Sequence, residues 1–258
     1  MKIIREIIDY REMIFSLIRR DLRGRYKGSV LGFMWTFINP LLQLCVYTVV
    51  FSIIMRMGID KYYIFLFVAL IPWMFFNTCL CGGTRVIFSQ EDMVKKIYFP
   101  REVLPISFVT SNFINMLLSF IVIFAVVFIS GIGISLSAVL YLPIVMLIEY
   151  ILALGITMFG AAATVYIRDL EQIFNIIGMA WMYMTPVLYS VDMVPEGLRG
   201  LYNLNPMTPI IVAYRDILYY KQPPQMDTLL SAAVLGVVVL AAGCFSFSRL
   251  KRRFAEEL

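Results

Sequence analysis

A stretch without any charged residue runs from Val103 to Ile148 and constrains the fold of this chain more than any other feature. A helix needs about 20 apolar residues to cross the ~30 Å hydrocarbon core of a bilayer, so this stretch is long enough for two crossings. The sequence Gly131-Ile132-Gly133 interrupts it and predicts the turn between them. Counting the other apolar runs in the same way predicts six membrane-spanning helices, at residues 28–55, 62–84, 103–130, 138–167, 173–189 and 228–248.

The composition agrees with a membrane protein and excludes a soluble one. Hydrophobic residues make up 61% of the chain and charged residues 15%, whereas soluble domains contain about 45–50% apolar and about 25% charged residues. Disorder is excluded as well, because so apolar a chain cannot stay solvated. The predicted fold class is an all-α membrane protein.

The first 27 residues do not form a secretory signal, because charges recur throughout them and interrupt any apolar core. Their apolar residues instead repeat at helical spacing, which predicts an amphipathic helix lying in the plane of the membrane surface. We therefore expect three regions: an interface helix at residues 1–27, a six-span domain at 28–250 and a cytoplasmic tail at 251–258.

The positions of the basic residues predict the orientation of the chain. With six spans both termini share one side of the membrane, and that side carries 17 of the 22 Lys and Arg residues. Basic residues accumulate on the cytoplasmic side, so both termini are predicted to be cytoplasmic. The net charge of +5 then reflects topology, and nucleic acid is not expected as a partner.

Residues suited to catalysis or metal binding are scarce. The chain has no histidine, and its four cysteines all lie in apolar stretches. Cys79 and Cys81 are separated by one residue, which is not the CxxC spacing of a zinc or redox site. We expect packing roles for the cysteines, no metal site and no catalytic residue.

The cytoplasmic loop from Arg85 to Arg101 mixes apolar and charged residues at helical spacing and predicts a short amphipathic helix. Composition alone fits a solvated connector as well as a docking element for a cytoplasmic partner. The residues predicted to dock are Phe88, Gln90, Glu91, Asp92, Met93, Lys95 and Lys96.

Five basic residues crowd the start of the first span: Arg19, Arg20, Arg23, Arg25 and Lys27. Most clusters of this kind anchor the chain and contact anionic lipids. Arginine also bonds phosphate groups with its planar fork, so a phosphorylated or diphosphorylated lipid headgroup is a second candidate ligand.

Aromatic residues form lines along two predicted spans. The first span carries Phe33, Phe37, Pro40, Leu44, Tyr47 and Phe51 on one face, and the fifth carries Phe174, Gly178, Trp181, Thr185 and Leu188. In a membrane helix such a line more often serves packing or lipid contact. In a pore it would present ring faces on which sugars can slide.

Two polar features fall within or beside the predicted spans. Glu149 lies mid-way along the fourth span, where a charge is costly. No basic residue in any span can pair with it, so we expect a structural carboxyl bonded to Asn, Ser or Thr rather than a proton relay.

Between the fifth and sixth spans, the apolar segment 209–220 is too short to cross the membrane. It therefore predicts re-entrant or interfacial helices, with Arg215 and Asp216 near the outer surface.

Four segments together resemble the membrane subunit of type-2 ABC exporters that move polysaccharides, the O-antigen, capsule and teichoic-acid permeases. These segments are RDLRGRYKGSVLGFMWTFINPLL at the first span, IYFPREVLPIS after the cytoplasmic loop, VYIRDLEQIF between the fourth and fifth spans, and NPMTPIIVAYRDIL in the outer loop. Their order and spacing carry the likeness along essentially the whole chain.

The resemblance implies a homodimer in the bacterial cytoplasmic membrane, bound to two copies of a separate ATPase, that exports a glycan linked to a lipid diphosphate. It implies that Arg85 to Arg101 supplies the coupling helix and that the first and fifth spans of both copies enclose the channel. The aromatic lines would then face the glycan, and the basic cluster would meet the diphosphate.

The chain contains no Walker A sequence, GxxxxGKS or GxxxxGKT. We therefore expect no cofactor in this chain and no enzymatic activity of its own, with ATP and Mg²⁺ bound by the partner ATPase.

Three alternatives remain open at the level of sequence. One is a drug, peptide or lipid exporter of the same architecture, against which an ATPase carrying an extra carbohydrate-binding domain would favour glycan export. Another is a membrane-embedded transferase acting on lipid-linked sugars, although the chain lacks a histidine and any cytoplasmic carboxylate cluster suited to metal. The last is a proton-coupled carrier, which would need Glu149.

Overall fold

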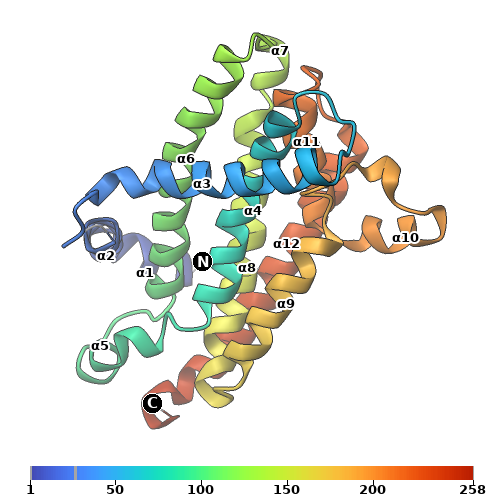
Figure 1. Cartoon of the computed structure of the whole chain (residues 1–258). Coiled ribbons are helices and arrows are strands. Elements are labelled where there is room, and N and C mark those ends of the chain that lie inside the picture. Colours follow the sequence, from blue (N-terminus) through green and yellow to red (C-terminus); the bar gives the residue numbers. More distant parts are fainter. Residues whose placement is uncertain (1, 26–27, 258) are drawn as a thin grey trace.

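The computed structural model describes residues 2–25 and 28–257, and every regular element in those two ranges is helical (Figure 1). The main helices are α1 (Lys2–Asp9), α2 (Arg11–Gly24), α3 (Trp35–Thr48), α4 (Tyr62–Gly83), α5 (Glu91–Lys96), α6 (Val103–Ile129), α8 (Leu142–Tyr166), α9 (Leu170–Met184), α10 (Glu196–Leu204), α11 (Met207–Leu218) and α12 (Met226–Leu250). Shorter helical turns are η1 (Gly32–Met34), η2 (Val49–Ile54), η3 (Phe88–Gln90), α7 (Leu136–Val139), η4 (Val191–Met193), η5 (Lys251–Arg253) and α13 (Phe254–Glu257). The predicted all-α class is confirmed.

Five segments of the described chain are long and apolar enough to cross a membrane. They are Gly32–Ile54, Tyr62–Gly83, Val103–Ile129, Leu136–Tyr166 and Met226–Arg253. These segments coincide with the predicted first, second, third, fourth and sixth spans, so the chain is a multi-pass membrane protein.

The predicted fifth span, 173–189, forms a shorter helix than expected. Helix α9 has 15 residues and ends at Met184, which falls short of the ~20 residues of a full crossing. Thr185 is extended, with φ −110° and ψ 137°, because the residue before a proline is pushed out of the helical region and Pro186 follows it. The predicted end at Tyr189 was therefore wrong.

Helix α4 forms the centre of the molecule. Leu66, Val68 and Ala69 are completely buried in its middle. Helices α3, α6, α8, α9 and α11 pack around it (Figure 1). A helix that is apolar on all sides is expected to be buried, and α4 meets that condition within one chain.

Helices α8 and α12 approach each other at a glycine contact. A Cβ atom added to Gly243 would lie 2.1 Å from the backbone oxygen of Gly155, which no side chain could tolerate. Small residues permit this close packing of membrane helices. The contact joins the predicted fourth and sixth spans into one unit.

Helix α3 lies across α4 and α6 rather than alongside them in the view of Figure 1. Most of its apolar side chains are exposed, including Leu42 and Val46. The preceding helix α2 packs against α6, where it buries Leu17 and Ile18. The predicted N-terminal amphipathic segment is thus helical, as α1 and α2.

The segment between α9 and α12 contains the short turn η4 and the helices α10 and α11, and α11 is buried among its neighbours. The hydroxyl of Tyr214 donates to Oε2 of Glu149 at 2.6 Å, so the partner of Glu149 is a tyrosine rather than the predicted Asn, Ser or Thr. The guanidinium of Arg215 donates to the carbonyl oxygens of Pro186 at 2.6 Å and Val187 at 2.7 Å. These bonds fix α11 to the chain that follows α9.

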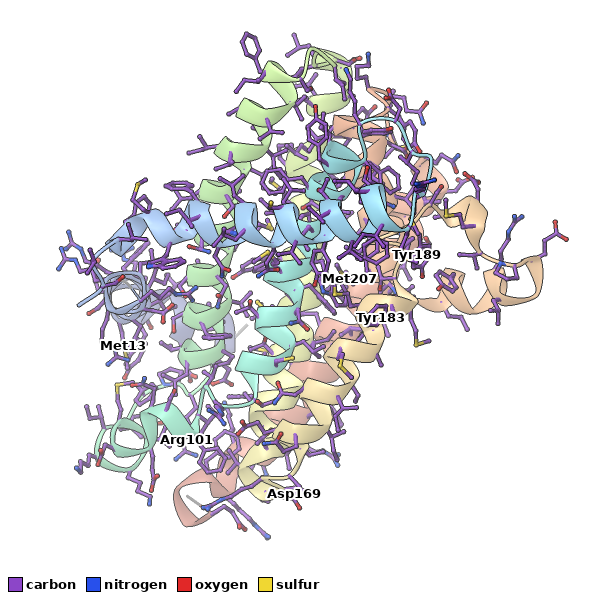
Figure 2. All side chains as sticks on the ribbon, in the orientation of Figure 1. Met13, Arg101, Asp169, Tyr183, Tyr189 and Met207 are labelled. Carbon is purple, nitrogen blue, oxygen red and sulfur yellow. The ribbon has the colours of Figure 1, made fainter. Side chains whose placement is uncertain are left out.

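Helix α5, the turn at residues 167–169 and the C-terminal end of the chain lie at one end of the molecule, and α7 lies at the other (Figure 1). Figure 2 shows Arg101 and Asp169 at this same end. The C-terminal residues fold back there: Phe254 is buried, Arg101 lies over its ring at 5.8 Å, and Lys251 pairs with Glu102.

Candidate functional site

The predicted basic cluster and the predicted coupling segment meet at one cleft. Its volume is about 540 Å³, and it lies between α2, the end of α4, the loop that follows α4 and the start of α6. Arg20, Arg25 and Arg85 line it, and we call it the arginine cleft. Arg20 donates to Oε1 of Gln90 at 2.8 Å, which links α2 directly to the coupling segment.

The arginine cleft keeps an excess of positive charge. Arg25 pairs with Asp21 at 2.8 Å, and Arg85 pairs with Glu171. The hydrogen bond and charge of Glu171 raise the pKa of Arg85 above its ordinary value. Arg20 bonds to the neutral amide of Gln90 and, among the residues that the structure describes, is paired with no carboxylate there. Two carboxylates therefore face three arginines, which leaves a net positive charge.

Arg25 is also tied to α6. Its guanidinium donates to Oδ1 of Asn112 at 2.8 Å, and the hydroxyl of Ser111 donates to Asp21. These bonds hold the start of the first apolar segment against the third. Arg25 therefore has both a packing role and a place on the cleft wall.

The remaining predicted phosphate ligands lie elsewhere. Arg19 and Arg23 are exposed on another face of α2, where they line a mostly apolar hollow of about 460 Å³ together with Phe15 and Phe33. Lys27 lies outside the described residues. The structure thus divides the predicted cluster instead of gathering it.

Arg85 is the cleft residue that the sequence did not assign to phosphate binding. It follows the apolar run that ends at Thr84, so the position of a cation directly after a span was the available signal. The sequence placed it only in the cytoplasmic loop, because nothing in that loop shows that α2 lies opposite.

The predicted coupling segment forms η3 and α5. Glu91 pairs with Lys95 at 2.6 Å and Asp92 with Lys96 at 2.7 Å, each one helical turn apart. The ammonium group of Lys96 lowers the pKa of Asp92. Asp92, Lys95 and Lys96 are exposed.

The other predicted coupling residues face the body of the protein more closely. Phe88, Gln90, Glu91 and Met93 are half-buried, and Val94 is fully covered. The guanidinium of Arg168, in the turn between α8 and α9, lies 5.3 Å from the ring centre of Phe88. The segment thus contacts both α2 and this turn, and its docking role stays a prediction.

The aromatic lines are placed differently on the two helices. Along η1, α3 and η2, Phe33 contacts Phe37 at 5.3 Å between ring centres, and Tyr47 contacts Phe51 at 6.4 Å. Phe33 is exposed, whereas Tyr47 and Phe51 pack against the core.

The two residues of α9 that were predicted to line the channel, Phe174 and Trp181, pack within the chain. Phe174 is buried and stacks on Phe159 at 6.4 Å. Trp181 donates from its indole nitrogen to Asn205 at 2.8 Å and meets Phe76 edge to face. The channel-lining role of both lines stays a prediction.

Comparison with known proteins supports one family. The family model described as ABC-2 type transporter matches residues 12–219. The chain is similar to the O-antigen export system permease protein RfbA of Myxococcus xanthus, at 36% identity over 100% of both chains. It is also similar to the protein of the same name from Klebsiella pneumoniae, at 31% identity over 96% of this chain and 95% of that one. The chain therefore belongs to the ABC-2 type transporter family of membrane proteins.

Proposed function

We propose that this chain is the transmembrane subunit of an ATP-driven exporter that moves a lipid-linked polysaccharide, of the O-antigen, capsule or teichoic-acid type, across the bacterial cytoplasmic membrane. The observation that carries the proposal is the arginine cleft, because it places an excess of cationic charge beside the segment expected to meet the ATPase. The full-length similarity to permeases named for O-antigen export supports the same substrate class.

The complete exporter contains two copies of this chain and two copies of an ATPase. The absence of a Walker A sequence supports a separate ATPase that binds ATP and Mg²⁺. The exposed apolar face of α3 supports contact with a second copy or with membrane lipids, since large exposed apolar surfaces mark interfaces.

The end of the molecule that carries α5 and the C-terminus faces the cytoplasm. The excess of Lys and Arg in the segments assigned to this side supports that orientation. The arginine cleft then opens where a lipid diphosphate made in the cytoplasm arrives. Arginine suits this ligand because its planar donors bond phosphate oxygens in pairs.

The glycan needs a polar route because each hydroxyl group would lose its water in hydrocarbon without replacement. Aromatic faces such as those of Phe33 and Phe37 supply part of such a route at the interface between the two copies. ATP binding draws the two ATPases together and moves the coupling segments. The bond between Gln90 and Arg20 passes that movement to α2 and to the cleft.

The test is reconstitution of export in cells that lack their own permease. Glycan should reach the cell surface only when this chain and its ATPase are produced together, and not when the Walker A lysine of the ATPase is replaced by alanine. Surface glycan without any ATPase would overturn the proposal. So would purification of the native complex without a nucleotide-binding subunit.

A further inference from the structure

A second hollow lies beside the arginine cleft, between α3, α4 and α6, with a volume of about 230 Å³. Three asparagines line it: Asn39 comes from α3, and Asn112 and Asn115 come from α6. We call it the asparagine hollow. Arg25 lines both the asparagine hollow and the arginine cleft, so the two spaces share a wall.

The three asparagines lie inside apolar segments. Asn112 and Asn115 are ~14 and ~18 Å along α6 from its first residue, at 1.5 Å per residue. Polar side chains at such positions are costly and usually line a substrate path or pair with another polar group. Three amides in one small space therefore indicate a ligand with many hydrogen-bonding groups.

The amides differ in how far the protein already satisfies them. Asn112 accepts from Arg25 at 2.8 Å and donates to the carbonyl oxygen of Phe108 at 2.8 Å. Asn39 is exposed, and Gln43 donates to its Oδ1 at 3.4 Å, near the limit of a hydrogen bond. Asn112 is thus a fixed wall, and Asn39 is free to exchange its weak bond for a ligand.

Aromatic rings complete the walls. Trp35 and Phe75 both line the hollow. The indole nitrogen of Trp35 donates to Ser29 at 3.1 Å, which holds the ring in place. A sugar presents hydroxyl groups that need donors and acceptors, as an amide supplies, and an apolar C–H face that suits an aromatic ring.

We infer that the asparagine hollow binds the sugar residue adjacent to the lipid diphosphate while the arginine cleft holds the diphosphate itself. The inference rests on the proposed function and adds a sugar site to it. The shared residue Arg25 places the two sites next to each other, as a glycosyl diphosphate requires. The volume of about 230 Å³ is below the ~300 Å³ of the smallest drug-sized pockets, so it suits one sugar ring rather than an oligosaccharide.

The experiment compares two probes on the full-length chain in nanodiscs: decaprenyl diphosphate, and the same lipid carrying a single N-acetylglucosamine. The wild-type chain should bind the sugar-bearing probe about tenfold more tightly, as expected for one or two added neutral hydrogen bonds. The double variant Asn39→Leu, Asn115→Leu should lose that preference and bind both probes alike. Asn175→Leu, an exposed asparagine on α9 outside the hollow, is the matched control and should keep the preference.

Binding of the sugar-free lipid reports that a variant is folded. If the double variant loses it, the single variant Asn39→Ala decides, because this side chain is exposed and its removal leaves the core intact. Equal wild-type affinity for both probes would overturn the inference and leave the proposed function standing, as would an unchanged preference in the asparagine variants. Failure of the wild-type chain to bind either lipid would instead count against the proposed function.

Discussion

The segments Gly32–Ile54 and Tyr62–Gly83 are both long and apolar enough to cross a membrane, yet the first is mostly exposed and the second mostly buried. In the most apolar 18-residue window of each, 11% of the residues are buried in the first segment and 78% in the second. Helix α4 lies in the centre of the molecule, whereas α3 lies across its surface (Figure 1). Their mean hydropathies are similar, 1.9 and 2.1, so the difference in burial comes from their neighbours.

The contrast shows which helix is fully covered by its own chain. The core around α4 is closed by α6, α8, α9 and α11 of the same chain. Helix α3 and the following η2 expose Leu42, Val46 and Ile53, which in a membrane protein contact either lipid or a second protein. One of the two spans that the family resemblance assigns to the channel is therefore largely exposed in the single chain.

The first prediction replaces one leucine by alanine in each of the two helices and compares the changes in stability. Leu66→Ala in α4 removes a completely buried side chain and should lower the free energy of unfolding by about 2–5 kcal/mol. Leu42→Ala in α3 removes a side chain that is 55% exposed and should change it by less than about 0.5 kcal/mol. Unfolding of the purified single chain by increasing SDS measures both.

The same pair of variants also distinguishes lipid from protein as the neighbour of α3. If a second copy covers Leu42, its substitution should weaken the dimer while leaving the single chain unaffected, as followed by native mass spectrometry. Equal losses of stability for Leu66→Ala and Leu42→Ala in the single chain would contradict the contrast between the two helices.

A smaller effect is expected where α9 meets α4. A Cβ atom on Gly178 would lie 2.6 Å from Oδ1 of Asn77 and 2.9 Å from Sγ of Cys81, both on α4. Gly178→Val should therefore cost about 1–3 kcal/mol by overpacking. Ala180→Val, on an exposed position of the same helix, is the control and should stay within about 0.5 kcal/mol. A harmless Gly178→Val would mean that α9 does not pack on α4 as described.

Much of the fold follows from the sequence because hydropathy and helix length are local properties. The five long apolar helices lie where the uncharged runs predict them. The predicted end of the fifth span was wrong because Pro186 ends helix α9, although the residues around it are apolar. The crossing direction of α3 and the burial of α11 depend on contacts between distant segments, such as Arg215 with Pro186 and Val187, which hydropathy does not encode.

The candidate site was predictable only in its residue types. The arginines before the first span were visible as a cluster, but a helix spreads neighbouring residues over different faces, so Arg20 and Arg23 line different hollows. Arg85 and Asn112 are brought to α2 only by the packing of α4 and α6. Because these residues lie far apart along the chain, that arrangement was not predictable from their positions.

The last prediction concerns α2, the helix that leads into α3, where a substitution should barely change stability but should change function. Arg20→Gln removes a cation from the arginine cleft and weakens the link to Gln90, while its exposed position leaves the core unchanged. One charge-assisted hydrogen bond to phosphate is worth about 1.5–3 kcal/mol. The concentration of decaprenyl diphosphate that stimulates the partner ATPase should therefore rise by about tenfold or more. Arg23→Gln, on the other face of α2, should shift that concentration less than about twofold, and Arg11→Gln near the start of α2 serves as a control. An equal shift for Arg20→Gln and Arg23→Gln would mean that the basic cluster acts through its net charge at the membrane surface. In that case the arginine cleft would not couple the exposed face of α3 to the ATPase.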